Sequence, residues 1–183
     1  DVINVIDRAV QLANAHQVAG ICTAPIHKKN LQVGAAFQYP GHTEFLADLA
    51  NVKDVVMMLI SPSLRVVPAT IHIPLSEVSR QLTPALLTKT IQITAQGLKE
   101  HFKIQTPRIA VAGLNPHAGE GGKMGREDLD LITPILERLN GQPAILTGPH
   151  SADTLFHAAA RQNYDAAIAM YHDQALIPIK TLD

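Results

Sequence analysis

The chain has no tryptophan and a single cysteine, Cys22, among its 183 residues. One cysteine excludes a disulfide within the chain and a zinc site built from cysteines. Aromatic residues make up only 4% of the chain, and 15 basic against 16 acidic residues leave a net charge of -1. A nucleic-acid-binding protein needs a basic surface and stacking side chains. We therefore expect no nucleic-acid partner.

Long apolar runs are also missing. No stretch reaches the about 20 apolar residues of a membrane-spanning helix, and the first residues lack the basic and apolar segments of a secretory signal. The chain nevertheless has 46% hydrophobic and 17% charged residues, which is enough apolar material for a core. We expect a cytoplasmic protein with no membrane partner.

The spacing of apolar residues predicts helices that alternate with strands. Predicted helices cover residues 2–15, a segment that Thr43 begins, 83–102, a segment from 127, and 152–161. Predicted strands cover residues 18–24, 55–60, 64–73, 108–114, 144–147, 166–171 and 177–182. The strands of the second half are continuously apolar, as in sheets covered on both faces. The sequence therefore predicts an α/β fold with a mostly parallel sheet flanked by helices.

Three histidines come at the ends of predicted strands. They are His72, His117 and His172. The carboxyl ends of strands are where open α/β sheets bind ligands, and three imidazoles can hold a divalent ion with open positions. No pair has a local ligand spacing such as HExxH. From spacing alone, three unrelated loop histidines therefore remain the more economical interpretation.

A glycine-rich loop over residues 115–125 joins a predicted strand to a helix. Glycines let backbone N–H groups approach a ligand, and a helix N-terminus favours anions. The loop is neither a Walker loop nor a GxGxxG fingerprint. Because it places His, Glu and Lys among its glycines, we expect more than a flexible connector.

Other polar residues are candidates for proton transfer or phosphate binding. Asp173 could orient a metal-bound imidazole or act as a general base. Asp153 stands near a helix start, where simple capping explains it equally well. His42 and Thr43 could hold a phosphate at a helix start, although Thr43 also suits an ordinary N-cap. Lys180 stands in an apolar predicted strand end, where a phosphate partner would explain it.

Four stretches together resemble one family, the 4-hydroxythreonine-4-phosphate dehydrogenases of pyridoxal 5'-phosphate biosynthesis. The stretches are GHTEFLA (41–47), GLNPHAGEGGKMGRED (113–128), ADTLF (152–156) and AMYHDQALIPIK (169–180). The resemblance runs in order over essentially the whole chain. It implies a fold like that of the isocitrate and isopropylmalate dehydrogenases, in agreement with the missing GxGxxG.

The resemblance implies a reaction. Members oxidise 4-phosphohydroxy-L-threonine with NAD or NADP, and the 3-keto acid then loses carbon dioxide to give 3-amino-2-oxopropyl phosphate. They need a divalent ion, variously zinc, magnesium, manganese or cobalt. The metal lowers the pKa of the substrate hydroxyl, and the nicotinamide takes the hydride.

The resemblance also implies roles for eight residues. The metal ligands are His72, His117 and His172, and the last of these comes from the partner subunit of a homodimer. The substrate-binding residues are His42, Thr43 and Lys180. The aspartates near the metal are Asp153 and Asp173, one of which takes the proton of the hydroxyl.

The chain departs from the family pattern in two ways. His150 and Ser151 stand where the family usually has an apolar residue and proline. Family chains are also longer at both ends, so we expect residues 1–183 to be the central portion of a two-subdomain dehydrogenase. The parent protein is expected to be an enzyme. The 183 residues alone lack parts of the phosphate clamp, and their cofactor-binding residues are unknown.

Three alternative functions remain open. A paralogous dehydrogenase could act on 4-phospho-threonate or 4-phospho-erythronate with the same metal and phosphate groups. Three histidines could instead activate a water molecule in a hydrolase. The chain could also be a non-catalytic phosphate-binding module. Neither of the last two explains the glycine loop, the lysine and the three histidines together.

Overall fold

The computed structural model describes residues 2–26, 38–39 and 41–182. The chain divides into two compact units, residues 1–55 and 56–183. The basic segment 27–29, which could add positive charge to a binding site, lies outside the described residues. No helix within the described ranges is long and apolar enough to cross a membrane.

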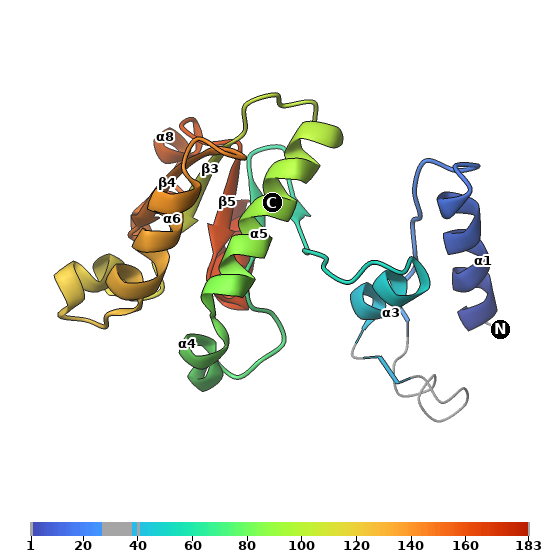
Figure 1. Cartoon of the computed structure of the whole chain (residues 1–183), viewed down its shortest axis with the longest axis horizontal. Helices are drawn as coiled ribbons and strands as arrows, with labels where there is room; N and C mark the ends of the chain where they lie inside the picture. Colours follow the sequence, from blue (N-terminus) through green and yellow to red (C-terminus); the bar gives the residue numbers. More distant parts are fainter. Residues whose placement is uncertain (1, 27–37, 40, 183) are drawn as a thin grey trace. The chain divides into compact units, whose positions relative to one another are not determined.

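The first unit contains two helices, α1 (Val2–Asn14) and α3 (His42–Leu49) (Figure 1). α1 confirms the predicted first helix, and its spacing of apolar residues buries Ile6 and Val10. Ile6 packs in one cluster with Phe45 of α3. The predicted cap of α3 is wrong. Gly41 is the N-cap residue and makes no side-chain cap, so Thr43 lies inside the first turn.

The strand expected at residues 18–24 does not form. Residues 20–26 carry no regular secondary structure, and Cys22 is exposed. This segment lines a cavity of about 450 Å³ together with Val2, Val5 and Ile6 of α1. The apolar run predicted a buried strand, but no strand within the described part of the chain pairs with it. Without such a partner most of its side chains stay exposed, although Ile26 packs against the cluster of Ile6 and Phe45.

The second unit is built around one five-stranded sheet, and this sheet is mostly parallel, as the sequence predicts. Its strands are β1 (Leu59–Ile60), β2 (Arg65–Pro68), β3 (Arg108–Ala112), β4 (Ile145–His150) and β5 (Ala166–Ala169). The order across the sheet is β1-β2-β5-β3-β4. β1 pairs antiparallel with β2, and every other pair is parallel. β5, the last strand in the chain, thus lies between β2 and β3.

Helices follow strands β2, β3, β4 and β5 of this sheet. They are α4 (Val78–Gln81), α5 (Pro84–Glu100), α6 (Thr133–Leu139), α7 (Ala152–Leu155), α8 (Ala158–Arg161) and α9 (His172–Leu182). A 3-10 turn, η1 (Leu75–Glu77), precedes α4, and a π-helical turn, η3 (Asp128–Ile132), precedes α6. α5 begins as predicted, since the hydroxyl of Thr83 accepts a hydrogen bond from the backbone N–H of Leu86 at 3.2 Å.

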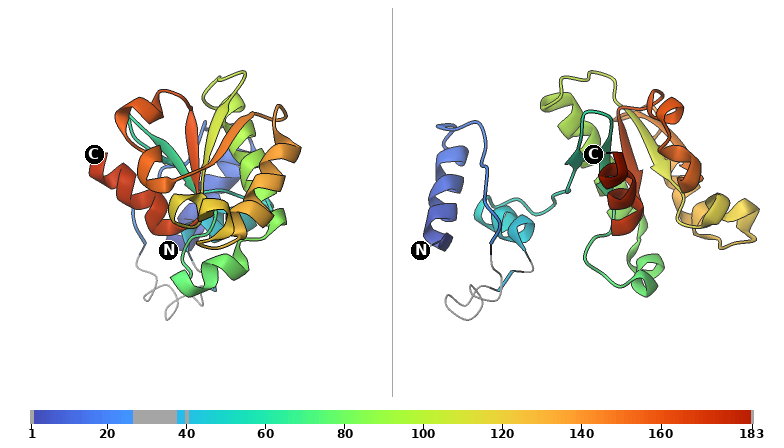
Figure 2. Two further views of the ribbon diagram at one scale, coloured as in Figure 1. Left: turned by 90° about the vertical axis from the view of Figure 1, so that its left-hand side faces the viewer. Right: turned by 180° about the vertical axis from the view of Figure 1, so that it is seen from behind.

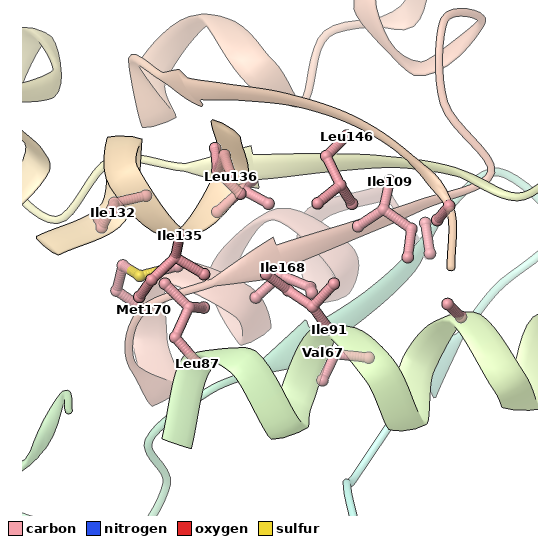
Figure 3. Close-up of a cluster of buried hydrophobic side chains, with 14 of the residues drawn as sticks. Val67, Leu87, Ile91, Ile109, Ile132, Ile135, Leu136, Leu146, Ile168 and Met170 are labelled. Atoms are coloured by element: carbon pink, nitrogen blue, oxygen red, sulfur yellow. The ribbon is translucent and has the colours of Figure 1, made fainter. Parts of the chain in front are cut away.

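Apolar side chains cover both faces of the sheet. On one face, α5 and α6 pack on alternate residues of the strands, such as Val67, Ile109 and Ile168 (Figure 3). On the other face, α7 and α9 pack on the intervening residues, such as Ala110 and Ala167. Figure 2 shows the strands between α9 on one side and α5 with α6 on the other. This burial on both faces explains why the strands are continuously apolar.

Three local predictions for this unit are wrong. Residues 177–182 are the end of helix α9 and not a strand. Residues 152–161 form two short helices, broken near Phe156. Of residues 55–60, predicted as one strand, only Leu59 and Ile60 pair in the sheet, as β1.

Residues 177–182 were predicted as a strand because they form an apolar run. Only one residue of this run, Ile179, is buried. In α9 the buried positions are Gln174, Ala175 and Ile179, and Ala175 and Ile179 are one helical turn apart. Lys180 lies in the last turn of this helix and is exposed. Its expected position in an apolar strand end is therefore wrong.

An ion pair joins two strands at the edge of the sheet opposite to the histidines. The carboxylate of Asp165 accepts hydrogen bonds from the backbone N–H of Arg108 at 2.8 Å and from its Nη2 at 2.9 Å. Burial alone would raise the pKa of Asp165, but the hydrogen bonds and charge of Arg108 outweigh it and hold this pKa below its ordinary value. The ionised carboxylate therefore stabilises the fold.

Replacement of Ile91 by alanine should lower the free energy of unfolding by about 2–5 kcal/mol, because Ile91 is fully buried and the change leaves a cavity. The matched change Ile177→Ala removes a side chain that is 65% exposed and should have an effect below about 0.5 kcal/mol. Urea unfolding followed by circular dichroism measures both. Equal effects would contradict the packing described above.

Replacement of Asp165 by asparagine should reduce the acid sensitivity of the fold. In the original chain the stabilisation is complete above the unfolded pKa of aspartate, about 3.9, and is lost as the pH falls through the lowered folded pKa. Asp165→Asn has no such proton to bind, so its stability should depend less on pH in this range. Urea midpoints measured between pH 2.5 and 7 test this. Parallel curves for the two proteins would contradict it.

Candidate functional site

The three strand-end histidines belong to the second unit and follow strands β2, β3 and β5. These strands are parallel neighbours in the order β2-β5-β3. Their carboxyl ends consequently meet at one edge of the sheet. His72, His117 and His172 all follow this edge, as the sequence predicts.

His72 and His172 lie side by side. Their ring centroids are 5.8 Å apart, and the ring planes are inclined by 43°. Backbone pairing between the two segments continues beyond the strands, since the N–H of Thr70 donates to the carbonyl of Met170. The hydroxyl of Thr70 donates to the same carbonyl at 2.7 Å. This pairing brings two histidines that are 100 residues apart in the sequence to one place.

The carboxylate of Asp173 contacts the imidazole of His172. Its Oδ1 atom lies 2.7 Å from Nδ1 of the imidazole, which leaves Nε2 to face another group. Asp173 and both histidines line a cavity of about 300 Å³ with Thr70 and Tyr171. Both roles expected for Asp173, orientation of an imidazole and acceptance of a proton, remain predictions.

His117 does not join the other two rings. Among the residues that the structure describes, no group of three or more His, Cys, Asp or Glu side chains is arranged to hold a metal ion. Two adjacent imidazoles are suitable ligands for a divalent transition metal, but a catalytic site commonly takes three protein ligands. One chain by itself therefore provides only part of the expected metal site.

The loop that carries His117 adopts an unusual left-handed turn, η2 (Pro116–Gly122). Five consecutive residues, from His117 to Gly121, have φ between 43° and 78°. For residues with a Cβ this conformation is unfavourable by roughly 1–2 kcal/mol each. His117, Ala118 and Glu120 are such residues, so other contacts must hold the loop in place.

The buried carboxylate of Asp128 is the main such contact. It accepts hydrogen bonds from the backbone N–H of Leu114 at 2.8 Å, from that of Asn115 at 3.2 Å and from the side-chain amide of Asn115 at 2.9 Å. Two glycines make room for it. A Cβ on Gly113 would lie 2.7 Å from Asp128 Oδ1, and one on Gly119 would lie 3.3 Å from Oδ2. At these two positions glycine leaves space for the buried carboxylate of Asp128 rather than for a bound ligand.

Gln174 joins the two halves of the edge. Its Oε1 accepts from the backbone N–H of Met170 at 2.6 Å, and its Nε2 donates to the carbonyl of Gly113 at 2.8 Å. The first bond fixes the segment that carries His172. The second ties that segment to the start of the glycine loop.

Asp153 lies close to this edge on helix α7. Asp153 and Asp173 line one cavity of about 450 Å³, whose walls include Phe156, Tyr171 and Ile177. The hydroxyl of Ser151 donates to Oδ1 of Asp153 at 2.5 Å. This hydrogen bond lowers the pKa of Asp153, and the charge of nearby His117 lowers it further. The structure thus brings both candidate bases to one cavity.

The predicted phosphate ligands occupy different elements. His42 and Thr43 form the first turn of α3 in the first unit. The buried Nε2 atom of His42 has no hydrogen-bond partner within the described residues, which suits a group that binds a ligand. Lys180 extends from the last turn of α9 in the second unit.

Sequence reasoning missed three residues that shape the site: Asp128, Gln174 and the hydroxyl of Ser151. Asp128 and Gln174 belong to the recognised motifs but have no role in the prediction. Gly113 and Gly119 both lie against the side chain of Asp128, which only the fold brings near them. These two glycines were the signal in the sequence that could have indicated a buried side chain. Ser151 was noted only as a departure from proline.

Comparison with known proteins gives one consistent result. The sequence profile described as "Pyridoxal phosphate biosynthetic protein PdxA" matches residues 1–183. The 4-hydroxythreonine-4-phosphate dehydrogenase of Ruegeria sp. (strain TM1040) is 62% identical over 182 residues. The alignment covers 100% of this chain and 56% of that protein, so the chain spans about half the length of this curated relative.

Solved structures agree with this result. The crystal structure of 4-hydroxythreonine-4-phosphate dehydrogenase from Klebsiella pneumoniae matches with a TM-score of 0.91 and 39% identity, over 98% of this chain and 54% of that one. A terephthalate 1,2-cis-dihydrodiol dehydrogenase from Burkholderia xenovorans LB400 matches with a TM-score of 0.77 and 30% identity, over 96% and 55%. These matches bear out the expected dehydrogenase fold.

Replacement of Asp128 by asparagine should lower the free energy of unfolding by about 1–3 kcal/mol, because an amide N–H₂ would then face backbone donors in a buried place. The control is Asp130→Asn two residues away, which removes an exposed ion pair with Arg126 and should change stability by less than about 0.5 kcal/mol. Urea unfolding compares them. An Asp128 variant as stable as the control would refute the role given to this carboxylate.

Proposed function

The chain belongs to the PdxA family of pyridoxal phosphate biosynthetic proteins, and we propose that its protein is a 4-hydroxythreonine-4-phosphate dehydrogenase. The observation that carries this proposal is that His72, His117 and His172 all follow the carboxyl ends of neighbouring parallel strands. Sequence identity alone identifies the family, whereas the position of the histidines indicates where in the fold the reaction would take place.

The proposed substrate is 4-phosphohydroxy-L-threonine. The hydroxyl group loses its proton to a base, and the carbon that bears it loses a hydride to NAD or NADP. The resulting 3-keto acid loses carbon dioxide, and a proton then replaces the lost group to give 3-amino-2-oxopropyl phosphate. The oxidant is therefore the nicotinamide cofactor that a dehydrogenase requires.

Two carboxylates are available for the proton transfer. Asp173 is engaged with His172 at 2.7 Å, so its proposed role is to orient that imidazole. Asp153 shares its cavity and bonds to Ser151 rather than to a histidine. We therefore assign proton acceptance to Asp153 and orientation to Asp173.

A divalent ion, such as zinc, magnesium, manganese or cobalt, would be held by His72, His117 and His172. When bound, it would lower the pKa of the substrate hydroxyl and stabilise the negative charge that develops there. Since three ligands do not converge within one described chain, we propose that two copies of a homodimer share the site. The resemblance assigns His172 to the partner subunit, so the His72 and His172 that lie side by side within one chain would belong to two different sites.

The phosphate group of the substrate would be held by His42, Thr43 and Lys180. The N-terminus of α3 carries partial positive charge, and Nε2 of His42, which has no hydrogen-bond partner among the described residues, can contact a phosphate oxygen. Lys180 supplies a full positive charge. A bound phosphate group would fix the orientation of the reacting carbon.

Metal content and turnover of the purified protein test the proposal. We expect about one divalent ion per chain and reduction of NAD or NADP with 4-phosphohydroxy-L-threonine. His72→Ala, His117→Ala and His172→Ala should each lose the ion and lower turnover at least about 100-fold. His101→Ala, an exposed histidine at the end of α5, is the control and should retain both. Turnover only with 4-phospho-threonate or 4-phospho-erythronate would indicate the paralogous activity.

Mixing two inactive variants tests whether the site is shared. If His72 and His172 of one site come from different copies, a mixed dimer of His72→Ala and His172→Ala has one intact site. Random mixing should then restore about a quarter of the original activity. If both histidines act from the same chain, mixing restores nothing, and the shared arrangement is wrong.

A further inference from the structure

Ser151 occupies the N-cap position of helix α7, but its hydroxyl does not cap the helix. A serine at this position normally accepts a hydrogen bond from a backbone N–H of the first turn. Here the hydroxyl donates instead to Oδ1 of Asp153 at 2.5 Å. The backbone carbonyl of Ser151 starts the turn, since it accepts from the N–H and the hydroxyl of Thr154 at 3.2 and 3.1 Å.

Asp153 needs such a contact to keep one orientation. Its side chain is exposed at the wall of the cavity that Asp173 also lines. An exposed carboxylate rotates readily about χ1, whereas a hydrogen bond to a charged acceptor is short and comparatively strong. The Ser151 bond occupies Oδ1 and leaves Oδ2 able to accept a proton.

We propose that Ser151 is a positioning residue, whose hydroxyl holds the Asp153 carboxylate in the orientation from which it accepts the substrate proton. This inference rests on the proposed function, because it takes Asp153 as the base. It assigns a role to a position where the family pattern usually has proline, which has no hydroxyl. A hydrogen bond therefore orients the carboxylate in this protein.

The backbone at Ser151 allows a sharp test. Its φ of -59° and ψ of 122° suit proline, whose ring fixes φ near -65°. The preceding residue, His150, ends strand β4 and so already has the extended conformation that proline requires before it. Ser151→Pro therefore removes the hydroxyl while it preserves the backbone, and it should not lower the stability of the fold.

The experiment compares Ser151→Ala, Ser151→Pro and Ser151→Thr in the purified protein. Ser151→Ala and Ser151→Pro lose the hydroxyl and should lower kcat about 10-fold, because part of the rate enhancement that a general base contributes depends on its orientation. KM should change less than twofold. Ser151→Thr keeps a hydroxyl and should restore kcat. Ser79→Ala, an exposed serine of α4, is the control and should leave kcat unchanged. Melting temperatures establish that all variants are folded.

A second measurement needs no turnover. Side-chain NMR couplings report whether Asp153 keeps one χ1 rotamer. We expect one rotamer in the original protein and in Ser151→Thr, and averaging over several in Ser151→Ala and Ser151→Pro.

The outcomes separate the two proposals. An original protein that fails to oxidise the substrate refutes the proposed function, and the couplings then still decide whether Ser151 orients Asp153. Unchanged couplings in the alanine and proline variants overturn the positioning role. So does a threonine variant whose kcat is as low as that of the alanine variant.

Discussion

The side-chain amide of Gln174 is the contact on which the candidate site depends most. It binds the backbone of Met170 with its oxygen and that of Gly113 with its nitrogen. Met170 leads to His172, and Gly113 leads to the loop of His117, so one buried side chain fixes the ends of two neighbouring strands. Because both partners are buried backbone groups, loss of the amide would leave them unsatisfied. Gln174 therefore fixes the position of one histidine-bearing segment relative to the other.

Asp128 has the same function within the glycine loop. The left-handed turn that presents His117 is unfavourable for each of its residues that carries a Cβ. Three hydrogen bonds to one buried carboxylate offset this, and glycines at 113 and 119 give the carboxylate its space. Strained backbone of this kind is common at functional sites, where the surrounding structure holds it in place. The hydrogen bonds to Asp128 at the start of the loop are thus as necessary to the candidate site as His117 itself.

The candidate site could be predicted in part. His72, His117 and His172 were identified because each follows an apolar run, and the structure places all three at one edge of the sheet. Their number and position did not decide between a metal site and unrelated loop residues, and only the family resemblance assigned them roles. One chain brings two of them together and leaves the third apart. In the proposed homodimer the three would meet through contacts between copies, and the spacing of residues in a single sequence does not encode such contacts.

The sequence by itself determined the features that local physics controls. The apolar stripe and the Thr83 cap define α5, and continuous apolar runs define the buried strands, because periodicity and capping act over a few residues. The tertiary structure alone decided what depends on distant partners. It turned residues 177–182 into a helix packed on the sheet, and it left residues 20–26 without a strand partner in the described chain. Pairing across 100 residues likewise placed His72 beside His172. Such pairings are set by which surfaces bury each other, and local sequence patterns contain no record of that choice.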